Sequence, residues 1–148
     1  MLLYTHLAAT ILAIIAFWPS VHSQLVFLVV ALLATLLPDI DTPGSKIGGL
    51  FPAKVLRLFT RHRGVLHSLT FVIIISVIFA FVIPVIALGF FVGYSSHLIL
   101  DSFTIEGIMP FWPYKKVVSW HVKTGGKRET IFFGVIVIFI VLVFAARF

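Results

Sequence analysis

Hydrophobic residues along the chain gather in five long runs that are separated by polar segments. The runs are Leu2 to Phe17, Val21 to Leu37, Leu66 to Ile83, Val85 to Leu100 and Ile131 to Ala146. Each is about 16 to 18 residues long, near the lower end of the roughly 17 to 25 residues that a membrane-spanning helix needs. The pattern predicts an all-α, polytopic membrane protein with about five short or tilted transmembrane helices, in a single integral membrane domain over residues 1–148.

The composition supports the same class of protein. The chain is 61% hydrophobic and 11% charged, with a mean hydropathy of +1.19, and one small soluble core cannot bury that much apolar surface. The first run has neither a basic segment before it nor a small-residue cleavage site after it, so we expect it to stay in the mature protein. The chain has no cysteine, which leaves only nitrogen and oxygen donors for any metal ion.

The breaks between the runs predict the topology. Trp18-Pro19-Ser20 and Pro84 predict two tight turns, so the longer segments 38–63 and 102–130 should share one side of the membrane with the N-terminus. Ten of the eleven Lys and Arg residues fall in these two segments. By the positive-inside rule this side is cytoplasmic in a multi-pass protein of the inner or plasma membrane. The basic belt would also attract anionic lipid headgroups, although topology alone would produce the same distribution.

Histidine and aspartate residues gather at those ends of the runs that the topology places on the cytoplasmic side. They are His6, Asp39, Asp41, His62, His67, His97 and Asp101. Ionisable groups in apolar surroundings are costly and usually functional, and these two residue types are common metal ligands. The sequence therefore predicts a metal site at one membrane face.

Two local spacings support the metal site. His97 and Asp101 are four residues apart and so project from one face of a helix, one turn apart. Asp39 and Asp41 flank Ile40 in an extended or turned segment, where a cation would relieve the repulsion between the carboxylates. A helix-end hydrogen bond and ordinary turn chemistry are the structural alternatives for the two pairs.

The third cluster surrounds a glycine. His62 is expected before the third helix and His67 within it, with Gly64 between them. Arg63 could bind an anionic phosphate oxygen of the substrate bidentately, or be a solvated loop residue.

Other residues are candidates for supporting roles or are set aside. Glu129 could contact substrate, support the ligands or act as a base, and charge complementarity at a helix N-terminus explains it equally well. His22, on the opposite side, and His121, in a basic aromatic loop, are left out of the metal set.

The number of candidate ligands bears on the chemistry. Four histidines and three aspartates exceed the needs of one tetrahedral zinc ion, so two or three neighbouring ions are plausible. A multinuclear site favours hydrolysis, of phosphate esters in particular. Nitrogen and oxygen ligands fit Zn²⁺ and also Mn²⁺ or Fe²⁺.

The motifs as a set resemble a known family. They are Thr5-His6, Leu37-Pro38-Asp39-Ile40-Asp41, His62-Arg63-Gly64 with His67-Ser68, Gly93-Tyr94 with Ser96-His97 and Asp101, and Thr124-Gly125-Gly126 with Glu129. This set, which covers most of the chain, resembles the YdjM-like membrane-bound metal-dependent hydrolases, inner-membrane proteins under LexA control. That family is distantly similar to zinc-dependent phospholipases C and single-strand nucleases. The resemblance implies phosphoester hydrolysis, with the seven His and Asp residues as the ligand pool and Asp39 or Asp41 as the catalytic base.

The sequence thus predicts a membrane-bound metal-dependent hydrolase that acts on a phosphoester of a lipid or of another membrane-associated substrate. No nucleic-acid partner is expected, because the scaffold is buried in the membrane and no soluble substrate cleft is recognisable. Two alternatives stay open. One is a metal or proton transporter, since intramembrane His and Asp also line ion pathways; the other is a non-catalytic membrane partner or assembly protein.

Overall fold

The structure is a computed structural model that describes residues 1–41 and 64–147. Its α-helices are α1 (Leu3–Phe17), α2 (Gln24–Leu36), α4 (Leu69–Val82), α5 (Pro84–Ser102) and α6 (Lys127–Arg147). The two described ranges contain only isolated β-bridges and no strand. The prediction of an all-α chain with five apolar helices is confirmed.

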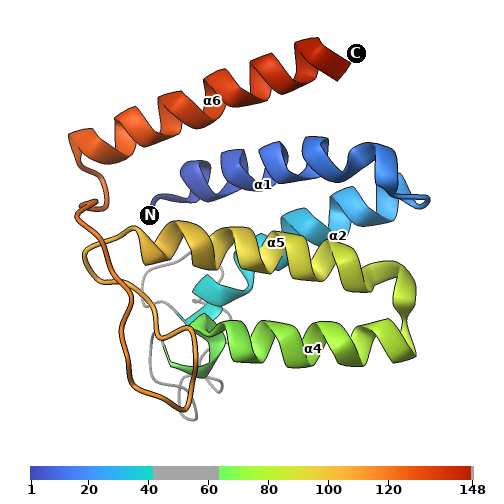
Figure 1. The fold of residues 1–148 in the computed structure, drawn as a ribbon, viewed down its shortest axis with the longest axis horizontal. Coiled ribbons are helices and arrows are strands. Elements are labelled where there is room, and N and C mark those ends of the chain that lie inside the picture. Colours follow the sequence, from blue (N-terminus) through green and yellow to red (C-terminus); the bar gives the residue numbers. More distant parts are fainter. Residues whose placement is uncertain (42–63, 148) are drawn as a thin grey trace.

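The helices run alternately up and down (Figure 1). Helices α1, α4 and α6 begin at the end of the bundle where α2 and α5 finish. Residues 103–126, between α5 and α6, fold over this end, which we call the loop end. Helix α5 lies centrally, in contact with α1, α2 and α4, while α6 packs along α1 at one edge. The predicted tight turns are present, at η1 (Trp18–Ser20) and at Pro84.

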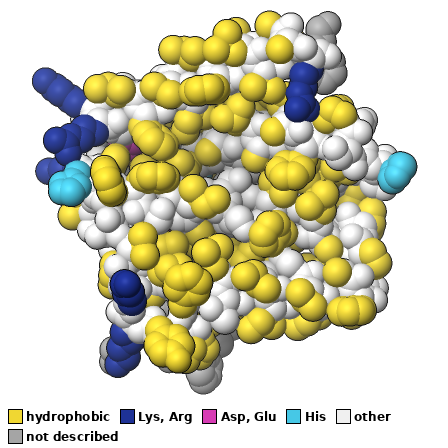
Figure 2. Space-filling model, viewed as in Figure 1, with side chains coloured by type: hydrophobic (Ala, Val, Ile, Leu, Met, Phe, Trp, Pro, Cys, Tyr) yellow, Lys and Arg dark blue, Asp and Glu magenta, His cyan; other side chains and the backbone are white. Residues whose placement is uncertain are grey.

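Among the described residues, three segments are long and apolar enough to cross a membrane, namely Leu3–Ser20, Pro84–Ser102 and Lys127–Arg147. Helices α2 and α4 are shorter, with 13 and 14 residues. Both are shorter than the apolar runs that predicted them, because apolar residues continue into the adjoining turns. Many large hydrophobic side chains are exposed on the outside of the bundle, as on the face that Figure 2 shows; Phe81, for example, is 85% exposed. Such a surface is suited to lipid.

Close packing of α2 against α5 depends on two glycines. A Cβ atom on Gly93 would overlap the backbone of Ala31, and one on Gly89 would lie 3.1 Å from the carbonyl oxygen of Phe27. Glycines four residues apart form a face on which another helix can approach closely in membrane proteins. This contact brings the C-terminal end of α2 beside the second half of α5.

The loop end carries most of the described positive charge. The segment 103–126 is held in shape by reciprocal backbone hydrogen bonds between Ile108 and Val118, of 3.0 and 2.9 Å. It contains Lys115, Lys116 and Lys123, and Lys127 and Arg128 follow in the first turn of α6. Lys and Arg side chains gather mainly at this end in Figure 2.

Candidate metal centre

Five of the seven predicted metal ligands come together at the loop end. His6 lies near the start of α1, Asp39 in η2 (Pro38–Asp41), His67 in η3 (Val65–His67), and His97 and Asp101 in the last two turns of α5. The three histidines and Asp101 are buried, while the side chain of Asp39 is 35% exposed. Four separate segments therefore contribute to one cluster.

Three predicted site residues cannot be placed in this cluster. His62 and Arg63 lie outside the described residues, and the side chain of Asp41, in η2, is also outside them. Their predicted roles stay predictions.

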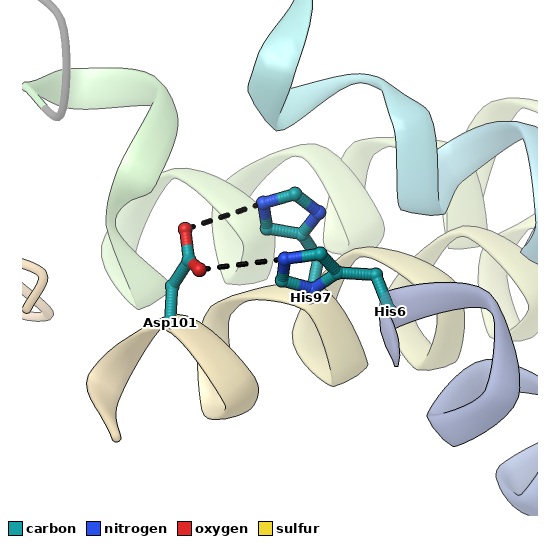
Figure 3. Close-up of side chains that lie close together, drawn as sticks. All are labelled: His6, His97 and Asp101. Atoms are coloured by element: carbon teal, nitrogen blue, oxygen red, sulfur yellow. Dashed lines mark ion pairs between the residues drawn. The ribbon is translucent and has the colours of Figure 1, made fainter. Parts of the chain in front are cut away.

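Asp101 stands at the centre of the cluster. Its Oδ1 atom lies 3.4 Å from Nε2 of His6, and its Oδ2 atom lies 3.4 Å from Nε2 of His97 (Figure 3). Oδ2 is also 3.8 Å from Nε2 of His67. The rings of His6 and His97 are stacked, with centroids 3.9 Å apart and planes inclined by 7°. The amino group of Met1 lies 2.8 Å from Oδ1, which gives the carboxylate a cationic neighbour.

Two overlapping triads could each hold a metal ion. One is His6, His97 and Asp101, and the other is Asp39, His67 and His97. Within each triad, one donor atom from every residue lies within 4.8 Å of the others. The donors are imidazole nitrogens and carboxylate oxygens, which Zn²⁺, Mn²⁺ and Fe²⁺ all accept.

The orientation of His97 is fixed by the end of α2. Its Nδ1 atom lies 2.8 Å from the carbonyl oxygen of Thr35, and because a carbonyl can only accept, Nδ1 carries the proton and donates it. Nε2 then presents a lone pair to Asp101 and to Asp39, whose Oδ1 is 3.8 Å away. Metal-binding histidines commonly donate their other N–H to a carbonyl in this way, which sets the tautomer and the ring orientation.

The carbonyl of Thr35 accepts from His97 because the helix ends there. The last four carbonyls of a helix have no partner within it. Helix α2 ends at Leu36, and one residue, Leu37, separates it from the turn that starts at Pro38. Proline has no backbone N–H to continue the hydrogen-bond ladder. The Leu37-Pro38-Asp39 segment thus supplies a candidate ligand and also ends α2 where His97 needs an acceptor.

The buried nitrogens of the first triad are suited to a cation. Both ring nitrogens of His6, and Nε2 of His97, have no hydrogen-bond partner among the described residues. Buried polar atoms are seldom left without a partner, since each one costs about 1–3 kcal/mol. Two stacked imidazoles with unused nitrogens beside a buried carboxylate fit a divalent metal ion.

The position of His97 limits how ions can be shared. Its Nε2 atom belongs to both triads, and its Nδ1 atom is engaged by Thr35. His97 can therefore serve only one ion at a time. An ion held by His6, His97 and Asp101 would leave Asp39 and His67 as donors for a second one. The predicted two or three ions stay a prediction.

His67 is held by a contact from α5, and its expected position was partly wrong. The hydroxyl of Tyr94 donates to the carbonyl of Leu66 at 2.8 Å, beside His67. His67 was expected within the third helix but lies in the preceding turn, because Ser68 is the N-cap of α4 and accepts the N–H of Phe71 at 3.2 Å. In this turn the His67 ring lies beside Asp101 and His97 of α5.

Glu129 lies outside both triads and has three donors of its own. It is fully buried and accepts hydrogen bonds from the N–H of Leu2, the hydroxyl of Thr5 and the N–H of Gly125, at 2.6, 2.9 and 2.6 Å. These contacts join the start of α1 to the start of α6. Its predicted role toward substrate stays a prediction. His22 and His121 are exposed and belong to neither triad.

The sequence did not predict the role of Thr35, whose carbonyl orients His97. The hydroxyl of Thr35 donates to the carbonyl of Ala31 at 2.8 Å and lies 2.8 Å from the hydroxyl of Thr10. It also lies 3.3 Å from the carbonyl of Gly93. The available signals were a threonine within each of two apolar runs and the Gly89-x-x-x-Gly93 spacing in a third.

Together, the apolar helices and the buried His and Asp cluster define a polytopic membrane protein with a candidate metal centre at one end of its bundle. The family model of the YdjM inner membrane protein matches residues 1–148. The chain belongs to this family of inner membrane proteins, which confirms the resemblance seen in its motifs.

Curated relatives are similar over part of their length. The uncharacterized protein YvsG of Bacillus subtilis (strain 168) is 39% identical over 100 residues, which cover 64% of this chain and 62% of YvsG. The inner membrane protein YdjM of Escherichia coli (strain K12) is 37% identical over 92 residues, which cover 56% of this chain and 47% of YdjM. The chain thus matches about half to two thirds of the length of these relatives. No solved structure matches it.

Proposed function

We propose that this protein is a membrane-bound, metal-dependent hydrolase that cleaves a phosphoester of a lipid or of another membrane-associated molecule. The observation that carries the proposal is that the two ring nitrogens of His97 have different surroundings. One ring nitrogen donates to the carbonyl of Thr35. The other, Nε2, faces the carboxylates of Asp101 and Asp39 and itself has no hydrogen-bond partner among the described residues. A purely structural buried histidine would usually satisfy both nitrogens, whereas a metal ligand keeps one lone pair available.

The described residues divide into holding and reacting groups in this proposal. His6, His67, His97 and Asp101 are buried and would hold one or two divalent ions, of which Zn²⁺ is the first candidate and Mn²⁺ and Fe²⁺ the others. When bound, such an ion acts as a Lewis acid that lowers the pKa of a coordinated water and stabilises a leaving oxygen.

Asp39 is the proposed base. It is the one member of the two triads whose side chain is substantially exposed, so it can take a proton from water and pass it to solvent. The buried residues around Asp101 exclude bulk water from the other side of the cluster. Asp41, in the same turn, shares this proposed role.

The proposed orientation places the cluster at the cytoplasmic face. The segment 103–126 and the first turn of α6 bring five Lys and Arg residues to the loop end, where the cluster also lies. By the positive-inside rule this end faces the cytoplasm, and its charge would attract anionic lipid headgroups. A phosphoester in a lipid headgroup would thereby meet the cluster at the membrane surface; nucleic acid is not proposed as a substrate.

The distribution of buried charge favours a hydrolase over a transporter. In residues 1–41 and 64–147 the buried histidine, aspartate and glutamate side chains all lie at the loop end: His6, His67, His97, Asp101 and Glu129. An ion pathway needs such groups across the membrane, and the other half of the described bundle offers none of them.

The first test is the metal content of detergent-purified protein. Wild type, His97→Ala and Asp101→Ala would be compared with His22→Ala, which changes an exposed histidine outside both triads. We expect at least one transition-metal ion per chain in wild type and His22→Ala, and loss of the ion in the other two variants. A wild type that stays metal-free after incubation with Zn²⁺, Mn²⁺ and Fe²⁺ would overturn the proposal and favour a non-catalytic membrane partner.

The reaction needs a separate measurement. The metal-loaded protein would be reconstituted in vesicles of mixed zwitterionic and anionic phospholipids, and release of water-soluble phosphoesters would be followed. We expect release with wild type and His22→Ala, and none with His97→Ala. Metal binding without release from any of these phospholipids would count against lipid phosphoester hydrolysis while leaving the metal site in place.

A further inference from the structure

Helix α1, which carries His6, lacks the groups that usually stabilise helix ends. Its N-cap residue, Leu2, offers no side-chain hydrogen bond, and there is neither an acidic residue in its first turn nor a basic residue in its last. Helix ends leave backbone N–H and C=O groups without partners, and the helix dipole favours negative charge at the start and positive charge at the finish. Partners for these groups must therefore come from outside α1.

Helix α6 supplies both of them. It lies along α1 and runs in the same direction (Figure 1), so its two ends meet the corresponding ends of α1. Glu129 accepts from the N–H of Leu2 at one end. At the other end Arg147 Nη1 donates to the carbonyls of Ile15 and Ala16, at 3.1 and 2.8 Å. Glu129 and Arg147, which are 18 positions apart on α6, thus contact the start and the end of α1.

The contact at Glu129 is the more specific of the two. Its Oε1 atom accepts from both Leu2 N–H and Thr5 Oγ1, and its Oε2 atom accepts from Gly125 N–H. Gly125 has φ of +73°, a conformation that residues with a side chain rarely adopt. A fully buried carboxylate is tolerated only when it is well hydrogen-bonded, and here three donors from two distant segments satisfy it.

The two residues that Glu129 holds lie just before His6: Leu2 is the N-cap of α1, and Thr5 is in its first turn. Thr5 directly precedes His6, and the N–H groups of Thr5 and His6 both donate to the carbonyl of Leu2, at 3.0 and 3.4 Å. Fixing Leu2 and Thr5 therefore fixes the backbone from which the His6 ring stacks on His97.

We propose that α6 clamps α1 at both ends, and that Glu129 is the positioning residue that holds His6 in the metal cluster. In this role Glu129 acts through His6 and is not itself a ligand of the ion. The effect of Glu129 on metal binding rests on the proposed function, but its effect on the position of the His6 ring does not. The two effects are therefore tested by separate experiments.

The first experiment measures the placement of His6 without any metal. Metal-stripped protein would be treated with diethyl pyrocarbonate, and modification of each histidine would be followed by mass spectrometry. In wild type, buried His6 and His97 should both react slowly. In Glu129→Ala the reaction of His6 should rise severalfold while His97, held by Thr35, stays protected.

Two milder variants, Glu129→Gln and Thr5→Val, guard against misfolding, and a third, Arg147→Ala, is the matched control. Glu129→Gln keeps one oxygen that can accept from Leu2 and Thr5, but its amide N–H then faces the N–H of Gly125. Thr5→Val removes one of the three donors to Glu129. Both variants should increase the reactivity of His6 less than Glu129→Ala does. Arg147→Ala removes the contact at the far end of the same helix pair and should leave His6 protected. Unchanged protection of His6 in Glu129→Ala, equal exposure of His97, or the same effect from Arg147→Ala would each overturn the proposal.

The second experiment measures affinity for Zn²⁺ and the visible absorption of the Co²⁺-loaded protein. Loss of a residue that orients a ligand usually lowers metal affinity about 10- to 100-fold, and we expect this for Glu129→Ala but not for Arg147→Ala. Because Glu129 acts through His6, adding Glu129→Ala to His6→Ala should cause no further loss; a full additional loss would refute the role toward the metal. A wild type that binds neither ion would refute that role and the proposed function together, while the reactivity of His6 would still decide its placement.

Discussion

Nδ1 of His97 lies 2.8 Å from the carbonyl oxygen of Thr35, although the two residues are 62 positions apart in the sequence. This contact joins the end of α2 to the centre of the candidate metal site. It also leaves Nε2 as the only nitrogen of His97 that can bind a metal ion. The geometry of the cluster therefore depends on how closely α2 and α5 pack.

Replacing His97 by asparagine separates its two contacts. The amide N–H of His97→Asn can still reach the carbonyl of Thr35, but the variant has no counterpart of Nε2. We expect both His97→Asn and His97→Ala to lose metal, with His97→Asn more stable by about 1 kcal/mol, the usual contribution of one hydrogen bond. Metal analysis and thermal unfolding of the metal-stripped proteins in detergent would show this. Metal retained by His97→Asn would contradict the assignment of Nε2 as the ligand.

Gly93 should tolerate no side chain. Because a Cβ atom there would overlap the backbone of Ala31, Gly93→Ala must push α2 away from α5, and overpacking of this kind costs about 1–3 kcal/mol. Metal affinity should fall as well, since the displaced helix carries Thr35. Gly134→Ala is the matched control, because a Cβ atom at Gly134 meets nothing within 4 Å. Equal unfolding temperatures for the two variants would show that the close helix contact is not needed.

The threonine pair between α1 and α2 should stabilise the fold without holding the metal. Thr10→Val and Thr35→Val each keep the shape of the side chain and remove one hydroxyl of the 2.8 Å contact. A double-mutant cycle should give a coupling of about 0.6 kcal/mol, as is typical between membrane helices. Metal content should be unchanged, since Thr35→Val keeps the carbonyl that accepts from His97. Loss of metal in Thr35→Val would assign the hydroxyl a role that the geometry does not give it.

Substitutions of Asp101 and Asp39 should have different effects, the first on metal binding and the second on the reaction. Asp101→Asn preserves the shape of the most central ligand but removes its charge, so we expect metal affinity to fall at least about tenfold. Asp39→Asn leaves the triad of His6, His97 and Asp101 intact, so this variant should keep at least one ion. Its rate of phosphoester release should fall about 10²- to 10⁴-fold, as expected for loss of a general base. Full activity of Asp39→Asn would exclude it as the base.

Removing the metal should weaken the fold. An ion that binds only the folded protein stabilises it, by about 2.7 kcal/mol at a concentration 100 times the dissociation constant. Thermal unfolding of the wild type should therefore shift downward after chelation and recover on addition of Zn²⁺. The Asp101→Ala variant, without its central carboxylate, should show no such shift. A wild type insensitive to chelation would indicate that its cluster is stabilised by protein contacts alone.

Much of the fold could be predicted from the sequence, because its main determinants are local. The apolar runs, each close to the length that spans a membrane, predicted five helices. Pro19 and Pro84 predicted the two tight turns. Alternation of helix direction then required His6, Asp39, His67, His97 and Asp101 to lie at one end. The structure brings these five side chains together, although helix lengths were overestimated where apolar residues enter turns.

Only the tertiary structure decided how the cluster is held. The sequence by itself determined that the chain is helical and apolar, and which ionisable residues share an end, because these features follow from hydropathy and chain direction. It did not determine that His97 donates to Thr35, that Gly93 lets α2 approach α5, or that Glu129 and Arg147 complete the ends of α1. Each of these depends on contacts between segments far apart in the chain, whose geometry is set by how whole helices pack.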